Sequence, residues 1–112
     1  MVTEVTACVG NTVTVRFDDN TYSVLFADNN EANLFKDELI ATVNDFNVNG
    51  RDKCKRKKAM FADPKTCSVS LNFNTDNSNK KWEMVATLSS AEEMNAFFKD
   101  VKFAVYGPMP GI

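Results

Sequence analysis

The chain has 112 residues, of which 44% are hydrophobic and 25% charged, and its formal net charge is −2. This length leaves room for one domain with one hydrophobic core. Histidine is absent, which removes the commonest general base, the commonest transition-metal ligand and every Ser-His or Cys-His catalytic arrangement.

Near the N-terminus, apolar and polar residues alternate in three successive runs. The runs cover residues 3–9 and 12–17 and continue through Tyr22, Val24 and Phe26, with short turns rich in Gly, Asn and Asp between them. Alternation with a period of two is typical of half-buried strands, and such turns join antiparallel neighbours. We therefore predict a β-meander. Its first strand is expected to carry Val5, Ala7 and Val9 on the core face.

A helix is predicted after this meander. Asp28 stands three residues before Glu31, the spacing of a capping box, in which each side chain satisfies a free backbone donor. The apolar residues that follow recur at spacings of three and four, which places them on one face of a helix. They are Ala32, Phe35, Leu39, Val43 and Phe46.

The second half of the chain is predicted to repeat this order. We expect strands over residues 59–62 and 67–73, a polar loop over 74–79 and a further strand over 81–88. In the last strand Trp82, Met84, Ala86 and Leu88 share the apolar face. Ser90 and Glu93 again have the capping-box spacing, and a second apolar stripe predicts a closing helix: Met94, Phe97, Phe98, Val101, Ala104 and Val105.

The two halves resemble each other, because the cap and stripe residues of the second helix fall 62 positions after those of the first. The predicted fold class is α+β, with two amphipathic helices and either one antiparallel β-meander sheet or two. If the pattern is a true repeat, two pseudo-repeated βββα units share one sheet, or their two sheets pack through the helices. The alternative is that any strand followed by an amphipathic helix gives this pattern. We expect a single domain over residues 1–108, with halves 1–47 and 58–106 joined by a basic loop at 48–58, and a flexible tail at 109–112.

The order of elements looks like parts of two known families. Residues 80–98, with Trp82 in a strand and Phe97 and Phe98 in a helix, resemble the terminal strand and helix of pleckstrin-homology-like domains, which carry one closing helix after seven strands. The helix predicted at 29–46 departs from that plan. The tandem order is more similar to the PUR repeat, a single-stranded nucleic-acid binder with four strands per helix and a basic, aromatic open face. Neither feature is evident here, and without a diagnostic motif we assign no family.

The strongest candidate site is the basic run at residues 51–58, which carries six positive charges and one negative. Its net charge of +5 on a chain of −2 leaves −7 for the remainder, so it forms a sharp patch of opposite sign. Such a run is suited to an acidic partner or to phosphate, and residues 55–58 match a loose nuclear-import pattern. The alternative is a solvated connecting loop. The candidate binding residues are Arg51, Lys53, Lys55, Arg56, Lys57 and Lys58.

Polar positions on the strands form the second candidate site, with Arg16 and Lys81 as sheet-face contacts. We expect them to face away from the helices, together with Thr12, Thr14, Ser68, Ser70, Asn72 and Glu83. Nucleic-acid platforms of this kind usually expose aromatic side chains on which bases stack. Here five aromatics fall on the apolar phase and are expected in the core, which disfavours nucleic acid: Phe17, Tyr22, Phe26, Phe73 and Trp82.

Localisation and cofactors follow from the cysteines and the first residues. Cys8, Cys54 and Cys67 are odd in number and widely spaced, which favours a reducing compartment. The first residues lack a signal-peptide pattern, and no stretch approaches the roughly 18 apolar residues of a membrane span. We therefore expect an intracellular protein, cytoplasmic or nuclear, with no membrane partner. Neither a metal nor another cofactor is expected.

The predicted function is a non-enzymatic binding module that engages another protein, as an adaptor or a small inhibitor-like protein. The alternative is a nucleic-acid-binding protein that uses residues 51–58 and a sheet face. An enzyme is less favoured, because no paired carboxylates suited to acid–base work are visible. A homodimer through an edge strand is compatible with each of these functions.

Overall fold

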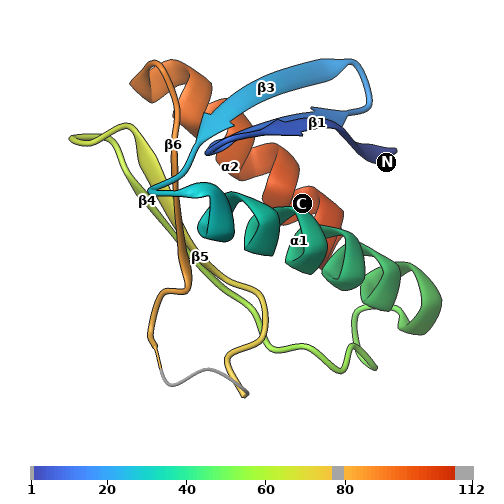
Figure 1. Ribbon diagram of the computed structural model, residues 1–112. Helices are drawn as coiled ribbons and strands as arrows, with labels where there is room; N and C mark the ends of the chain where they lie inside the picture. The colour runs from blue at the N-terminus through green and yellow to red at the C-terminus, as the bar shows by residue number, and fades with distance from the viewer. Residues whose placement is uncertain (1, 77–79, 108–112) are drawn as a thin grey trace.

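The computed structural model describes residues 2–76 and 80–107, so the predicted tail at 109–112 and part of the predicted loop at 74–79 lie outside the described residues. Two helices and six strands follow the order strand–strand–strand–helix twice, which confirms the α+β class (Figure 1). The helices are α1 (Asn29–Asn49) and α2 (Ala91–Tyr106). The strands are β1 (Thr3–Val9), β2 (Thr12–Phe17), β3 (Asn20–Leu25), β4 (Ala59–Asp63), β5 (Ser68–Asn72) and β6 (Met84–Thr87).

All six strands belong to one antiparallel sheet with the order β1-β2-β3-β6-β5-β4. Each half is a three-stranded meander, and the two halves meet at a narrow seam where Leu25 of β3 pairs with Thr87 of β6. Beside the seam, the backbone N–H of Val85 donates to the Glu31 carboxylate, at 2.7 Å. Figure 1 shows β3 turned away from β4, β5 and β6, so the sheet bends strongly between its halves.

Both helices pack against the concave face of this bent sheet and against each other. Helix α1 contacts β1, β2 and β6, whereas α2 contacts β2, β4 and β5. Phe35 of α1 and Phe97 of α2 are fully buried, with ring centroids 6.2 Å apart. Phe17 and Phe73 bring further buried rings from the two halves of the sheet, so one aromatic core joins all the elements.

The predicted helix starts are confirmed. The Asp28 carboxylate accepts from the backbone N–H of Glu31 at 2.8 Å, and the Ser90 hydroxyl accepts from that of Glu93 at 3.1 Å. The reciprocal half of each capping box does not form as predicted, since Glu31 binds β6 and Glu93 binds the Ser89 hydroxyl.

Buried positions correspond between the two halves at the 62-residue spacing. The five buried residues of α1 (Ala32, Phe35, Leu39, Thr42 and Val43) match the five of α2 (Met94, Phe97, Val101, Ala104 and Val105). Leu25 and Thr87, the paired residues at the seam, have the same spacing. Pairing between corresponding residues of the two halves is what an approximate two-fold axis at the seam would produce. The pseudo-repeat itself stays a prediction.

The predicted inward face of β1 is wrong beyond Val5. A register shift between Val5 and Ala7 in the pairing with β2 marks a bulge, which places one extra residue in β1. The alternation changes phase there, so Cys8 packs against the core and Val9 is 76% exposed.

The predicted strand at 81–88 begins three residues late, at Met84. Trp82 lies before it, outside the ladder, and is half-buried instead of belonging to the core. Two predicted exposed positions, Ser68 and Asn72, are buried. The Asn72 amide donates to the carbonyls of Lys80 and Lys81, at 3.0 and 3.3 Å, so this segment crosses over Asn72.

Candidate binding surfaces

The basic loop was predicted over residues 48–58, but α1 continues to Asn49, so the loop begins at Gly50. It is anchored to α1 by the Asp45 carboxylate. This group accepts from the backbone N–H of Lys55 at 3.0 Å and from that of Arg56 at 3.1 Å. Desolvation acts to raise the pKa of Asp45, but these hydrogen bonds, one from Asn49 and the charge of Lys58 together hold the pKa below its usual value. The loop therefore has a defined attachment to the helix.

Two of the predicted binding residues in this loop lie against acidic side chains of the same molecule. Arg56 forms an ion pair with Glu38 of α1, in which the side chains are only 25% and 22% exposed. The Lys57 ammonium lies 3.7 Å from the Asp76 carboxylate, and both side chains are exposed. Part of the positive charge in the run is thus neutralised within the molecule.

Arg51 and Lys58 converge on the end of α2. The Arg51 guanidinium donates to the backbone carbonyl of Tyr106 at 3.0 Å, and the Lys58 ammonium lies 5.0 Å from the centre of the Tyr106 ring. The Tyr106 hydroxyl donates to the Lys58 carbonyl at 2.8 Å, and burial raises the pKa of this hydroxyl. Lys53 and Lys55 are exposed. A hollow of about 270 Å³ is lined by the other four predicted cations, Arg51, Arg56, Lys57 and Lys58, with Phe46, Cys54, Val105 and Tyr106.

The two predicted sheet-face contacts lie in different halves of the sheet. Arg16 is on β2, where its guanidinium lies 2.8 Å from the Glu4 carboxylate of β1. Lys81 precedes β6, and its ammonium lies 5.7 Å from the centre of the Trp82 ring. The structure therefore does not join Arg16 and Lys81 into one site.

Apolar side chains missed by the sequence analysis gather on the outer face of the sheet, opposite the helices. Phe61 of β4 is 55% exposed, and its ring centre lies 6.4 Å from that of Trp82. Ser70 pairs with both Phe61 and Val85, so these two residues lie in one row across β4, β5 and β6. Val85 is 42% exposed, and Leu25 at the seam is also exposed. We call Leu25, Phe61, Trp82 and Val85 the outer apolar strip.

The amino-acid sequence predicts one member of the outer apolar strip but not another. Phe61 stands out of phase with Met60 and Ala62, which face the core, so alternation alone places it on the opposite face. Trp82 gives no such signal, because its position follows from the late start of β6.

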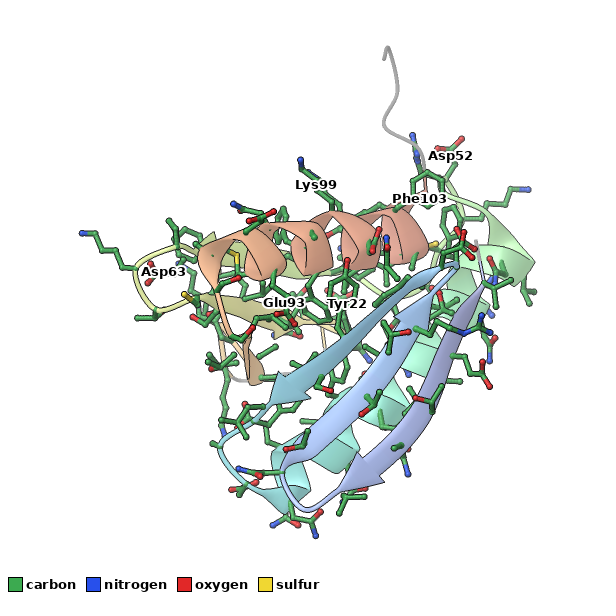
Figure 2. All side chains as sticks on the ribbon, turned by 90° about the horizontal axis from the view of Figure 1, so that it is seen from above. Tyr22, Asp52, Asp63, Glu93, Lys99 and Phe103 are labelled. Carbon is green, nitrogen blue, oxygen red and sulfur yellow. The ribbon has the colours of Figure 1, made fainter. Side chains whose placement is uncertain are left out.

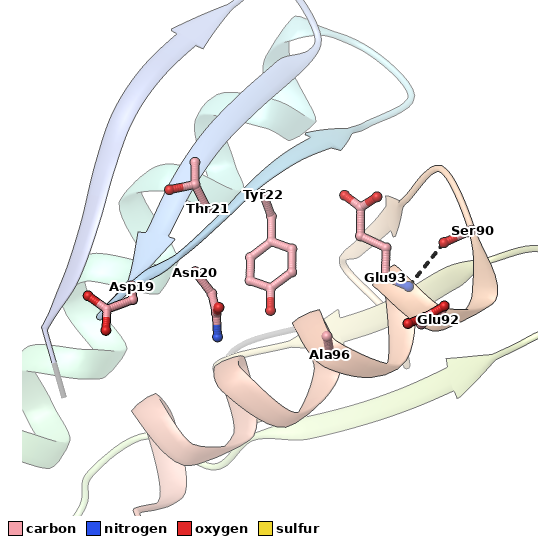
Figure 3. A pocket seen from close by; sticks show the side chains of 8 residues that line it. All are labelled: Asp19, Asn20, Thr21, Tyr22, Ser90, Glu92, Glu93 and Ala96. Carbon is pink, nitrogen blue, oxygen red and sulfur yellow. Dashed lines mark hydrogen bonds between the residues drawn. The ribbon is translucent and has the colours of Figure 1, made fainter.

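A further hollow, of about 380 Å³, lies between β3 and the first turns of α2 (Figure 3). The Tyr22 hydroxyl donates to the Asp100 carboxylate at 2.7 Å, and the Asn20 amide donates to the same oxygen at 3.1 Å. Burial raises the pKa of Tyr22, and the hydrogen bond to Asp100 adds to this, so the phenol stays protonated. These bonds hold β3 to α2. The hollow is lined by Asp19, Asn20, Thr21, Tyr22, Ser90, Glu92, Glu93 and Ala96.

Within residues 2–76 and 80–107, no group of three or more His, Cys, Asp or Glu side chains is arranged to hold a metal ion. None of the helices described there has the length and apolar character that crossing a bilayer requires. Comparisons with protein-family models, with curated proteins and with solved structures find no match.

Proposed function

We propose that this protein is a non-enzymatic binding module that engages another protein through its outer apolar strip. The exposure of Phe61 and Val85 on one sheet face, with the half-buried Trp82 ring beside Phe61, carries the proposal. Exposed apolar side chains that adjoin one another are typical of interaction sites. Tryptophan is moreover enriched among the residues that dominate binding energies. Binding removes these side chains from water, which supplies the driving force.

A protein partner is favoured over nucleic acid by the distribution of positive charge. Nucleic-acid affinity depends on cations free to contact phosphates. In the basic loop Arg56 is paired with Glu38, and Lys57 lies near Asp76. On the sheet, Arg16 is paired with Glu4. The strip thus has aromatic surface without a row of free cations beside it.

One observation favours the second candidate, a nucleic-acid-binding protein. Lys81 lies over the Trp82 ring, beside Phe61. Partly exposed aromatic rings next to a cation are suited to stacking bases and binding the adjoining phosphate. The sequence predicted Trp82 to lie in the core, whereas in the structure its ring is partly exposed.

The three cysteines form no disulfide bond in the structure, which supports the proposed intracellular location.

The strip is tested with Trp82→Ser and Val85→Ser, and with Val9→Ser as a matched control, because Val9 is an exposed apolar strand residue outside the strip. Partners purified on the wild-type protein are re-expressed, and their affinities are measured by titration calorimetry. We expect Trp82→Ser to weaken the binding free energy by about 2 kcal/mol or more. Val85→Ser should weaken it less, and Val9→Ser should leave it unchanged. Equal binding by all four proteins would exclude the strip.

Oligonucleotide binding separates the two candidates. Trp82 is the only tryptophan, so its fluorescence reports on the strip directly. We expect no fluorescence change with single-stranded oligonucleotides at low salt. A change that declines steeply with added salt and disappears in Lys81→Glu would favour the nucleic-acid function.

A further inference from the structure

The sheet ends at β4, and this edge is unprotected. One side of β4 pairs with β5 over five residues without a register shift, and the other side faces no strand in the described part of the chain. Edge strands are commonly blunted by bulges, prolines or inward charges. The β4 sequence, Ala-Met-Phe-Ala-Asp, contains none of these before its last residue, Asp63.

A groove runs between β4 and α2, which we call the β4 groove. It has a volume of about 510 Å³, and its lining is mainly apolar. Phe103 is 42% exposed in it, Phe98 is half-buried, and the small side chain of Ala62 leaves room between strand and helix. Figure 2 shows Phe103 and Lys99 on the side of α2 that faces away from β1, β2 and β3.

Two lysines of α2 give the β4 groove a positive rim. Lys99 is exposed, and the Lys102 ammonium lies 5.8 Å from the centre of the Phe98 ring. Neither lysine makes an ion pair with a residue that the structure describes. The groove is therefore complementary to a ligand that combines apolar and acidic side chains.

We propose that the β4 groove binds an extended, acidic peptide segment of a partner protein, which adds to β4 as a further strand. The backbone of the peptide would use the free hydrogen-bonding groups of the β4 edge. Because side chains alternate along a strand, every second apolar side chain would enter the groove toward Phe98 and Phe103. Acidic side chains of the segment would lie beside Lys99 and Lys102. This rests on the proposed function in one respect, that the ligand is a polypeptide, but it concerns another surface.

A second copy of this chain is a poorer occupant of the groove. Its β4 is directly preceded by Lys57 and Lys58, so it would bring positive charge toward a groove with two lysines on its rim. Like charges placed together at an interface oppose binding.

The molecule contains its own control for this groove. A corresponding β1 groove, of about 630 Å³, lies between β1 and α1 and includes Lys36, Asp37, Ile40 and Ala41. These residues stand 62 positions before Phe98, Lys99, Lys102 and Phe103. It lacks the aromatic lining and the two-lysine rim, so an acidic apolar peptide should not prefer it.

The test uses a panel of fluorescently labelled peptides of about eight residues, somewhat longer than an average strand, in which glutamate alternates with valine, isoleucine, leucine or phenylalanine. Fluorescence anisotropy measures their affinities. We expect saturable binding by at least one peptide. Phe103→Ser and Lys102→Glu should each weaken it by about tenfold or more, equivalent to about 1.4 kcal/mol. Ile40→Ser in the β1 groove should leave it unchanged.

Two altered peptides test whether the ligand adds to β4 as a strand and whether its acidic side chains contribute to binding. Backbone N-methylation at alternate positions should abolish binding if strand addition occurs, and replacement of glutamate by lysine should weaken it. Hydrogen exchange should show added protection of the Ala59–Asp63 amides. Circular dichroism checks that each protein variant is folded.

Several results would overturn the inference. The inference fails if no peptide of the panel binds, or if Phe103→Ser leaves the peptide affinity unchanged. It also fails if the added protection from hydrogen exchange is confined to the β1 amides. A dimer seen by light scattering and dissociated by Phe103→Ser would assign the groove to a second copy and overturn it as well. Trp82→Ser and Val85→Ser should not affect these peptides, so failure of the outer apolar strip and failure of the β4 groove are distinguishable.

Discussion

The β1 and β4 grooves occupy corresponding places in the two βββα halves and differ in chemistry. At the positions of Phe98 and Phe103 in the second half, the first half has Lys36 and Ala41. In the interior, by contrast, Phe35 and Phe97 correspond and both are fully buried. Close packing limits what an interior position accepts, whereas a groove at the sheet edge is free to change. This difference between the halves favours the β4 groove as the binding surface.

The edge strands follow the same contrast. β1 contains a bulge between Val5 and Ala7, which bends an edge and makes it a poor template for another strand. β4 pairs regularly with β5 throughout. The edge beside the β1 groove is thus protected, and the edge beside the β4 groove is open.

The most damaging substitutions test whether the two halves contribute equally to the shared core. Phe35→Ala and Phe97→Ala each remove a fully buried ring and should each destabilise the protein by about 3–5 kcal/mol. Urea unfolding measures both values. Losses of stability that differ by more than the spread of this range would show that one half dominates the core.

A smaller effect is expected at an anchor found in the first half alone. Tyr22 donates to Asp100, whereas Met84 at the corresponding position has no hydroxyl. Tyr22→Phe should lose about 1.5–3 kcal/mol, the range for a hydrogen bond to a charged group. Urea unfolding near neutral pH measures it, with Tyr106→Phe for comparison. Equal costs would remove the special role of the Asp100 bond.

The same variant predicts a pH dependence. The pKa of Tyr22 is raised in the folded state, first by burial and then by Asp100. A raised pKa contributes stability that is fully present below the unfolded value of about 10 and is lost as the pH rises above it. The free energy of unfolding should therefore decline less steeply above about pH 10 in Tyr22→Phe than in the wild type.

The two helix caps are expected to contribute similarly to stability. Asp28 and Ser90 accept corresponding backbone hydrogen bonds, so Asp28→Ala and Ser90→Ala should each cost about 1 kcal/mol. Thermal unfolding followed by circular dichroism measures both. A negligible loss at either site would show that packing alone determines that helix start.

The smallest global effect is expected at Asp45, whose corresponding position in the second half is Gly107. Its pKa is lowered because the backbone hydrogen bonds of Arg56 and Lys55, with Asn49 and Lys58, outweigh desolvation. The stability it contributes is present above the unfolded pKa and is lost as the pH falls through the folded pKa. Asp45→Asn should speed hydrogen exchange at the Lys55 and Arg56 amides near neutral pH. Asp52→Asn, at an exposed loop position, is the control and should leave both amides unchanged.

Local patterns in the sequence predicted most of the elements. The alternation in β2, β3 and β5 and the stripes of both helices depend only on which side chains repeat along the chain, and the burial of Val15, Leu71 and Phe97 agrees with them. The starts at Asp28 and Ser90 are also local, because the cap bonds span three residues.

Features that depend on contacts between residues distant in the chain could not be predicted from these local patterns. The bulge in β1 and the late start of β6 arise from strand pairing, and one extra residue reverses every later side chain. The basic loop was visible as charge, but the pairing of Arg56 with Glu38 requires the loop to return to α1. The outer apolar strip and the β4 groove likewise exist only because β4, β6 and α2 come together in space. Periodicity specifies which face of an element is apolar, whereas the packing of the elements determines which apolar surfaces remain uncovered.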